Sequence, residues 1–335
     1  MKRFCGFCVL TALGILVAGM IVWAMLALYY SDIQSGLLRA CLAGFFGLAA
    51  VCAFVLLPDR RRTLICFFVA WVLVAAWWVT ISPSNSRDWQ EDVAVLPRAT
   101  IQGDRVTLHN IRNFSYRTDT DYTARYYDKT FELARISSVD LIAVYWMGDT
   151  IAHIMLSFGF GGTDYVAFSI ETRKEKNEAY STLKGIFKQY ELMYIVGDER
   201  DLIRVRTDYR DPQEDVYVYR LRTAPKGARQ LFLEYVNKIN RLNAEPEFYN
   251  TLTTNCTTDV VALARALGSD MRYSWKVVLS GYAPEYAYEL GKLDSRLPFA
   301  ELRRRSLINL RAHAVGDDLA FSIKIREGLP MPAAQ

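Results

Sequence analysis

The stretch IAHIMLSFGFGGTDYVAFSIE, residues 151–171, decides the fold of the larger part of this 335-residue chain. It contains two apolar segments, and the run FGGT at 160–163 between them is a strong turn signal. Short apolar segments that flank a glycine-rich turn are typical of paired strands. We therefore predict two strands, 151–158 and 165–170, that pair as an antiparallel hairpin.

The register of this hairpin places polar side chains together. If Gly161 centres the turn, His153 of the first strand lies opposite Ser169 of the second. Glu171 then lies diagonal to His153 on the same face, whereas a slip of one residue moves these two partners to the other face. The pattern predicts a polar group on one face of an otherwise apolar hairpin.

Strand and helix patterns surround the hairpin in an order that indicates the fold class. Helical spacing of apolar residues predicts two helices, 228–242 and 257–267, the second followed by Gly268. The other segments expected to be regular are strands at 105–116, 141–147 and 216–221 and a short helix at 284–290. Strands mostly precede helices, so we predict an α+β domain around an antiparallel sheet.

Three apolar runs at the beginning of the chain predict a membrane anchor. They cover residues 5–30, 37–57 and 64–81, and each is long enough for a helix to cross a hydrocarbon core of roughly 30 Å. Buried helices of a soluble core are the alternative, but these runs have no polar face. We assign residues 1–82 to the anchor, 83–94 to a linker and 95–335 to a second domain.

The charges predict the orientation of the anchor. Lys2 and Arg3 precede the first run and Arg60, Arg61 and Arg62 separate the second from the third, whereas residues 31–36 hold no Lys or Arg. Positive loops stay in the cytoplasm, so we expect a cytoplasmic amino terminus in the inner membrane and a periplasmic main domain. The net charge of +4 lies entirely in the anchor. No basic domain remains to bind nucleic acid.

Cysteine usage singles out one thiol. Five of the six cysteines lie in the apolar runs, and only Cys256 lies in the second domain. Cys256 falls at the start of the predicted helix 257–267, where the helix dipole and free N–H groups favour a thiolate and can bind an oxyanion. A small residue packed at a helix start is the alternative, and we favour the functional interpretation. Asn255 is a helix-capping residue and a further candidate for orienting the site.

A thiol nucleophile needs a base, and His153 is the best candidate. An imidazole inside an apolar strand is costly unless it is hydrogen-bonded or lies in a cleft; a satisfied core histidine is the alternative. Glu171 is our first choice for the group that orients it, because a carboxylate stabilises an imidazolium better than a hydroxyl, and Ser169 is the second. His109 and His313 lie in polar surroundings and are expected at the surface.

Other polar groups give weaker signals. Candidates for binding a head group are Arg112, Asn113, Tyr116, Arg125 and Tyr126. The cluster around residues 199–206, which includes Arg204 and Arg206, is interpreted as a structural ion-pair network. No metal-ligand spacing, Walker loop or dinucleotide glycine pattern occurs, so we expect no metal and no cofactor.

Several separated motifs together resemble the Lnb-type periplasmic domain family. They are AHIMLSFGF (152–160), SIETR (169–173), YEL (190–192), DERD (198–201), FYNTL (248–252) and NCTT (255–258). The resemblance implies a bacterial envelope protein related to a lipoprotein N-acyltransferase. It also implies a circularly permuted papain-like core, similar to the lecithin:retinol acyltransferase group, with Cys256 as nucleophile and His153 as base. The three preceding membrane helices depart from what we expect throughout that family.

From this resemblance we expect a membrane-anchored thiol acyltransferase. It implies that Cys256 takes an acyl chain from a phospholipid and passes it to an amine, namely the amino-terminal cysteine of a lipoprotein. One alternative is a Cys–His hydrolase of peptide or ester bonds, in which water accepts the acyl group. The other is a non-catalytic envelope scaffold with a buried Cys256. Acyl-chain preference, the acceptor and the oligomeric state are left open by the sequence.

Overall fold

The chain folds into two compact units. A computed structural model describes residues 2–266, 272 and 274–332. One unit consists of Met1–Ser84 and Tyr180–Tyr190, and the other of Asn85–Ala179 and Glu191–Gln335. The segment Tyr180–Tyr190 thus belongs to the first unit although its neighbours in sequence belong to the second.

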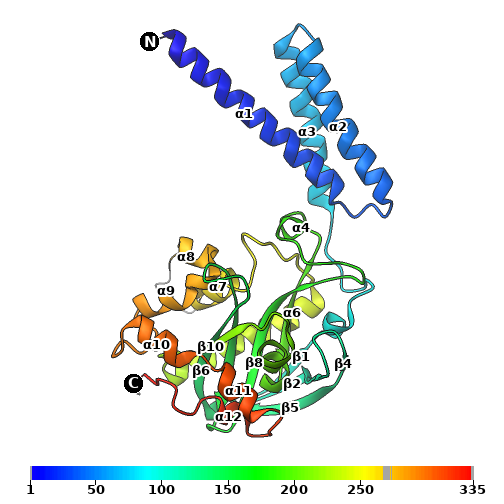
Figure 1. Cartoon of the computed structure of the whole chain (residues 1–335). Coiled ribbons are helices and arrows are strands. Elements are labelled where there is room, and N and C mark those ends of the chain that lie inside the picture. Colours follow the sequence, from blue (N-terminus) through cyan, green and yellow to red (C-terminus); the bar gives the residue numbers. More distant parts are fainter. Residues whose placement is uncertain (1, 267–271, 273, 333–335) are drawn as a thin grey trace. The chain divides into compact units, whose positions relative to one another are not determined.

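The first unit contains three long apolar helices, α1 (Lys2–Tyr29), α2 (Gly36–Leu56) and α3 (Arg60–Thr80) (Figure 1). Each is long and apolar enough to cross a membrane, as the sequence predicts. Ser35 and Asp59 cap α2 and α3 because their side-chain oxygens accept a backbone N–H of the first turn.

The segment Tyr180–Tyr190 packs on the ends of α1 and α3 within this unit. It contains the short helix α4 (Thr182–Ile186), and Phe187 after it stacks on Tyr30 with ring centroids 5.9 Å apart. Lys188 Nζ donates to three backbone oxygens where α3 ends, at 3.0–3.2 Å, those of Trp78, Val79 and Ile81. A cation at the carboxyl end of a helix satisfies carbonyl groups that have no partner within the helix.

The second unit is built on one sheet with the strand order β1-β2-β9-β8-β7-β6-β10, and β5 also pairs with β2 (Figure 1). Neighbouring strands are antiparallel except for β2 and β9, which meet in parallel at Arg112 and Gly197. The strands are β1 (Arg98–Gln102), β2 (Arg105–Arg112), β5 (Tyr126–Glu132), β6 (Ile136–Tyr145), β7 (Ala152–Phe160), β8 (Asp164–Arg173), β9 (Glu191–Gly197) and β10 (Asp215–Arg220); β3 (Ser115–Tyr116) and β4 (Tyr122–Thr123) form a separate pair.

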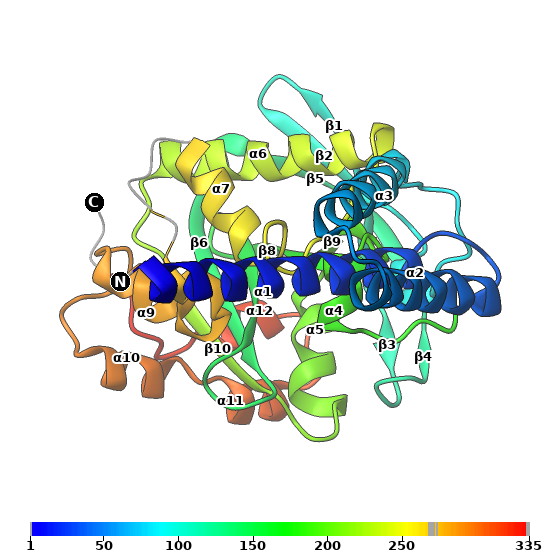
Figure 2. The same ribbon diagram turned by 90° about the horizontal axis from the view of Figure 1, so that it is seen from above.

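Helices cover both faces of this sheet (Figure 2). On one face α6 (Pro225–Ala244) inserts Phe232 and Tyr235 between Phe158 of β7 and Phe168 of β8, with ring centroids 5.3–5.9 Å apart. On the other face the buried side chains come from the sheet and from α5 (Glu199–Leu202), α11 (Asn309–Val315) and α12 (Phe321–Lys324). The remaining helical segments are η1 (Glu91–Val93), η2 (Leu133–Arg135), η3 (Val205–Tyr209), α7 (Thr258–Ala266), α8 (Trp275–Val278), η4 (Ser280–Tyr282), α9 (Ala283–Glu289) and α10 (Phe299–Ser306).

The predicted hairpin of β7 and β8 forms, but its register differs from our prediction. Phe160 pairs with Asp164 and Met155 with Ser169, so the turn is centred on Gly162 and the predicted register is wrong by two residues. Three residues form the turn because both Gly161 and Gly162 adopt positive φ. A shift of two keeps every side chain on its predicted face.

The predicted architecture of three apolar helices followed by a mixed α/β sheet domain is confirmed. The permuted papain-like topology of its core stays a prediction. The predicted helices 228–242 and 257–267 correspond to α6 and α7, although Leu267 and Gly268 lie outside the described residues. The weak pattern at 105–116 marks the single strand β2 followed by the short β3.

Candidate active site

Two neighbouring strands present three polar side chains on one face. His153 Nε2 lies 2.6 Å from Ser169 Oγ and 3.1 Å from Glu171 Oε1. The Ser169 hydroxyl donates to Glu171 Oε1 at 2.6 Å, so serine and carboxylate form one hydrogen-bonded unit beside the imidazole. Continued by two residues, the observed register places Glu171 directly opposite His153. Both residues that we proposed as the third member therefore contact the histidine.

Asn255 determines how the chain enters α7 just after Cys256. Its Oδ1 accepts the backbone N–H groups of Thr257 and Thr258, both at 2.9 Å, and its own N–H donates to Thr258 Oγ1. This reciprocal arrangement is an N-cap. The cap occupies two of the N–H groups that we expected to be open to an oxyanion, so that prediction is wrong for Thr257 and Thr258.

Cys256 lies against the beginning of β7. The His153 imidazole and the backbone N–H of Ile154 lie close enough to the thiol to lower its pKa, and Sγ lies 3.8 Å from Thr257 Oγ1. Because Nε2 of His153 is engaged by Ser169 and Glu171, Nδ1 is the ring nitrogen left to face the thiol.

The surroundings of the pair favour its charged form. Burial opposes a charge on His153, but the Glu171 carboxylate and the hydrogen bond to Cys256 outweigh it and raise the pKa of His153 to about 9. Burial likewise penalises the thiolate, but His153 and the Ile154 N–H lower the pKa of Cys256 overall. Burial also opposes ionisation of Glu171, yet His153 and the Arg206 guanidinium hold its pKa well below the ordinary range.

The directions of these shifts favour a Cys256 thiolate beside a His153 imidazolium over the neutral pair, which is the state of an activated thiol. The side chains of His153 and Glu171 are 13% and 27% exposed and Cys256 is half-buried, so a reactant can approach them. The scaffold alternative required a buried Cys256, and the half-buried thiol does not favour it.

Sequence reasoning missed one residue of this site. Arg206 Nη2 lies 3.4 Å from Glu171 Oε1, although we interpreted it as part of a structural network. The only signal was the density of charges around it, which does not distinguish the two roles. The other two histidines lie outside the site, His109 between Thr100 and Asp128 and His313 near Asp208.

The predicted head-group residues occupy a different place. Arg112 makes a two-pronged contact with Asp201 at 2.8 and 3.0 Å, and Tyr116 also donates to Asp201. Arg112 and Asp201 are buried, so this cluster joins β2 to α5 and favours a structural role for Arg112 and Tyr116. The other three candidates are nearby: the Asn113 N–H donates to the Arg125 carbonyl, and Tyr126 packs on the Phe114 ring.

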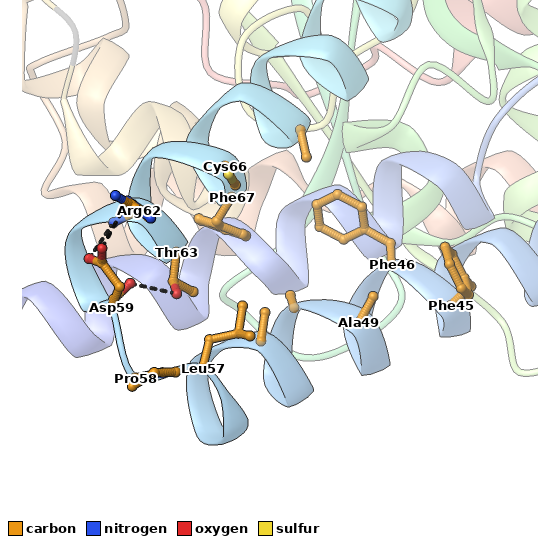
Figure 3. Close-up of a pocket in the computed structure, with 13 residues that line it drawn as sticks. Phe45, Phe46, Ala49, Leu57, Pro58, Asp59, Arg62, Thr63, Cys66 and Phe67 are labelled. Atoms are coloured by element: carbon orange, nitrogen blue, oxygen red, sulfur yellow. Dashed lines mark hydrogen bonds and ion pairs between the residues drawn. The ribbon is translucent and has the colours of Figure 1, made fainter.

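An apolar cavity of the protein is lined by other residues than those of this site. Within the described part of the chain, no group of His, Cys, Asp and Glu side chains has the geometry to hold a metal ion. A cavity of about 450 Å³ lies between α2 and α3, lined mainly by apolar side chains with Asp59, Arg62 and Thr63 at one end (Figure 3). It lies in the candidate membrane spans and contains none of the site residues.

The thiol–imidazole–carboxylate site lies in an α/β domain that follows three candidate membrane helices. These helices and the family match of that domain together indicate a membrane protein with an extracytoplasmic domain. Residues 122–281 match the model of the Lnb N-terminal periplasmic domain family, and this confirms the resemblance seen in the motifs. The matched segment includes His153, Glu171 and Cys256. No curated protein and no solved structure matches the chain.

Proposed function

We propose that the protein is a thiol acyltransferase of the bacterial cytoplasmic membrane, which moves an acyl chain from a phospholipid to an amine through a Cys256 thioester. The observation that carries the proposal is the placement of the Cys256 thiol beside His153, whose imidazole is hydrogen-bonded to Ser169 and Glu171. A thiolate with an oriented imidazole is the minimum machinery for acyl transfer.

His153 gives up one proton in the first half-reaction and gains another in the second. In the first, the Cys256 thiolate attacks the ester carbonyl, the C–O bond breaks, and His153 gives its proton to the departing lysophospholipid oxygen. In the second, the amine attacks the thioester and His153 takes its proton. The C–S bond then breaks, an amide is released, and the thiolate and imidazolium are restored. Glu171 stays ionised throughout and holds the ring in position.

The anchor supports a lipid donor and a lipoprotein acceptor. Both of these substrates reside in the bilayer, so an enzyme held there by three helices meets them without a search through water. The amine that fits is the α-amino group of the lipid-modified cysteine at the start of a lipoprotein. This acceptor comes from the Lnb-type resemblance.

The test compares two cysteines of the same full-length protein in a bacterial host that has no other lipoprotein N-acylation. Cys256→Ala should abolish N-acylated lipoprotein peptides in mass spectra, and Cys66→Ala in α3 should leave them at the wild-type level. Undiminished N-acylation in the Cys256→Ala protein contradicts the mechanism.

Mass analysis of Cys256 itself separates this proposal from the alternatives. A fatty-acyl adduct on the trapped thiol supports lipid chemistry, whereas a muropeptide adduct supports a hydrolase of the cell wall. A Cys256 that carries no adduct and reacts only slowly with an alkylating agent at neutral pH supports the scaffold.

A further inference from the structure

We propose that Arg206 is a positioning residue of the active site, which acts on His153 through Glu171 and sets the pH at which the imidazolium loses its proton. The inference rests on the proposed site around Cys256 but not on the identity of its substrates. It concerns a residue that neither the motifs nor the predicted ion-pair network assigned to the site.

The contacts of Arg206 differ from those of the structural arginines in this domain. Arg112 and Arg326 each make a two-pronged contact with a buried carboxylate, Asp201 and Glu199 respectively. Arg206 instead makes one long contact, 3.4 Å from Nη2 to Glu171 Oε1. A guanidinium with a purely structural role is expected to bind a carboxylate through two parallel N–H groups.

One donor of Arg206 is buried and finds no hydrogen-bond partner among the described residues. It is Nε, whose printed carboxylate contact is with Glu214 Oε2 at 4.0 Å. The residue is only 8% exposed, so an unpaired N–H there costs stability. Retention of a buried, incompletely paired charge beside the Glu171 carboxylate fits a role in the electrostatics of the site.

The local backbone brings Arg206 to this position. Residues Val205–Tyr209 form a π-helix, closed by the bond from the Arg210 N–H to the Val205 carbonyl at 3.0 Å. Such wide turns are rare and occur frequently at functional sites. This one places Arg206 beside the face of β8 that carries Glu171 and Ser169.

The charged groups around His153 determine the sign of the effect. Glu171 from β8 and Cys256 from the start of α7 face the imidazole, and Arg206 from η3 faces Glu171. Glu214 and Tyr116 lie near Arg206 on its other sides. Arg206 keeps Glu171 ionised, yet its positive charge also disfavours a second cation nearby. Without the Arg206 charge, the Glu171 carboxylate interacts more strongly with the His153 imidazolium, and the pKa of the imidazole rises.

The test reads His153 directly by nuclear magnetic resonance. Full-length protein labelled with ¹⁵N-histidine contains three imidazoles, and His153→Gln identifies the signal of interest. We expect the His153 midpoint in Arg206→Gln to rise by about half a pH unit or more, with Arg206→Lys near the wild type. Arg210→Gln is the matched control, because Arg210 is half exposed and pairs with the same Glu214 but does not contact Glu171.

The outcomes decide between positioning and structural roles. An unchanged or lowered His153 midpoint in folded Arg206→Gln overturns the proposal, and so does an equal rise in Arg210→Gln. If Arg206→Gln does not fold, Glu214→Gln replaces it, because freeing Arg206 from its second carboxylate should lower the His153 midpoint. A rise or no change in Glu214→Gln then overturns the proposal. None of these measurements requires acyl transfer, so failure of the Arg206 proposal can be distinguished from failure of the proposed function.

Discussion

Glu171 is the residue that most favours the charged form of the Cys256–His153 pair. It lies 3.1 Å from His153 Nε2, and its negative charge offsets the cost of burying an imidazolium. The pKa of His153 is raised to about 9 and that of Cys256 is lowered, and both shifts favour the ion pair. It is lost above about pH 9, as the imidazolium gives up its proton, and at acid pH, as the thiolate takes one up.

Glu171→Gln should therefore slow alkylation of Cys256 by iodoacetamide at pH 7 by about tenfold or more, since one pKa unit is a tenfold change in thiolate fraction. Without the carboxylate, burial lowers the pKa of His153, and the uncharged ring no longer stabilises the thiolate. Asp164→Asn on the same strand is the control, because its partner Lys129 lies outside the site. Equal alkylation rates for wild type and Glu171→Gln would count against a carboxylate that supports the imidazolium.

At the scale of elements, the short helix η4 holds the beginning of β7, the strand that carries His153. The Gly281 N–H donates to the Thr150 carbonyl at 3.0 Å, and Ser280 Oγ accepts the Ala152 N–H at 3.0 Å. Tyr145 of β6 donates to the Gly281 carbonyl at 2.6 Å. His153 follows directly after the residues held in this way, so η4 contributes to its position.

Gly281→Ala should distort the site because no space exists for a methyl group. An added Cβ would lie 2.1 Å from the Asp149 carbonyl oxygen and 2.7 Å from the Thr150 carbonyl carbon, and both are backbone atoms. We expect a loss of about 2 kcal/mol in the free energy of unfolding, with a lower thermal midpoint and slower Cys256 alkylation. Gly227→Ala in α6, where the added atom makes an ordinary contact at 3.4 Å, should lower none of these three quantities. A stable, fully reactive Gly281→Ala protein would show that η4 does not position β7.

At the scale of the whole molecule, the charges between the candidate membrane helices predict the topology. Arg60, Arg61 and Arg62 begin α3, whereas the connection before α2 carries no Lys or Arg. Alkaline phosphatase fused after Ser86 should therefore be active, because we expect the chain to leave α3 outside the cytoplasm. The same enzyme fused after Asp59 should be inactive. The reverse pattern of activities would place the sheet domain in the cytoplasm.

The sequence alone was enough to predict the three apolar helices, the β7–β8 hairpin with its polar face, and the placement of Cys256 at a helix start. These features depend on run length, periodicity and turn residues, which are local. The fold decided the rest: the two-residue shift in register, the capping of Thr257 and Thr258 by Asn255, the Arg112–Asp201 pair and the approach of Arg206 to Glu171. Each of these depends on which of several equivalent partners comes within hydrogen-bonding distance, and only the packed chain determines that.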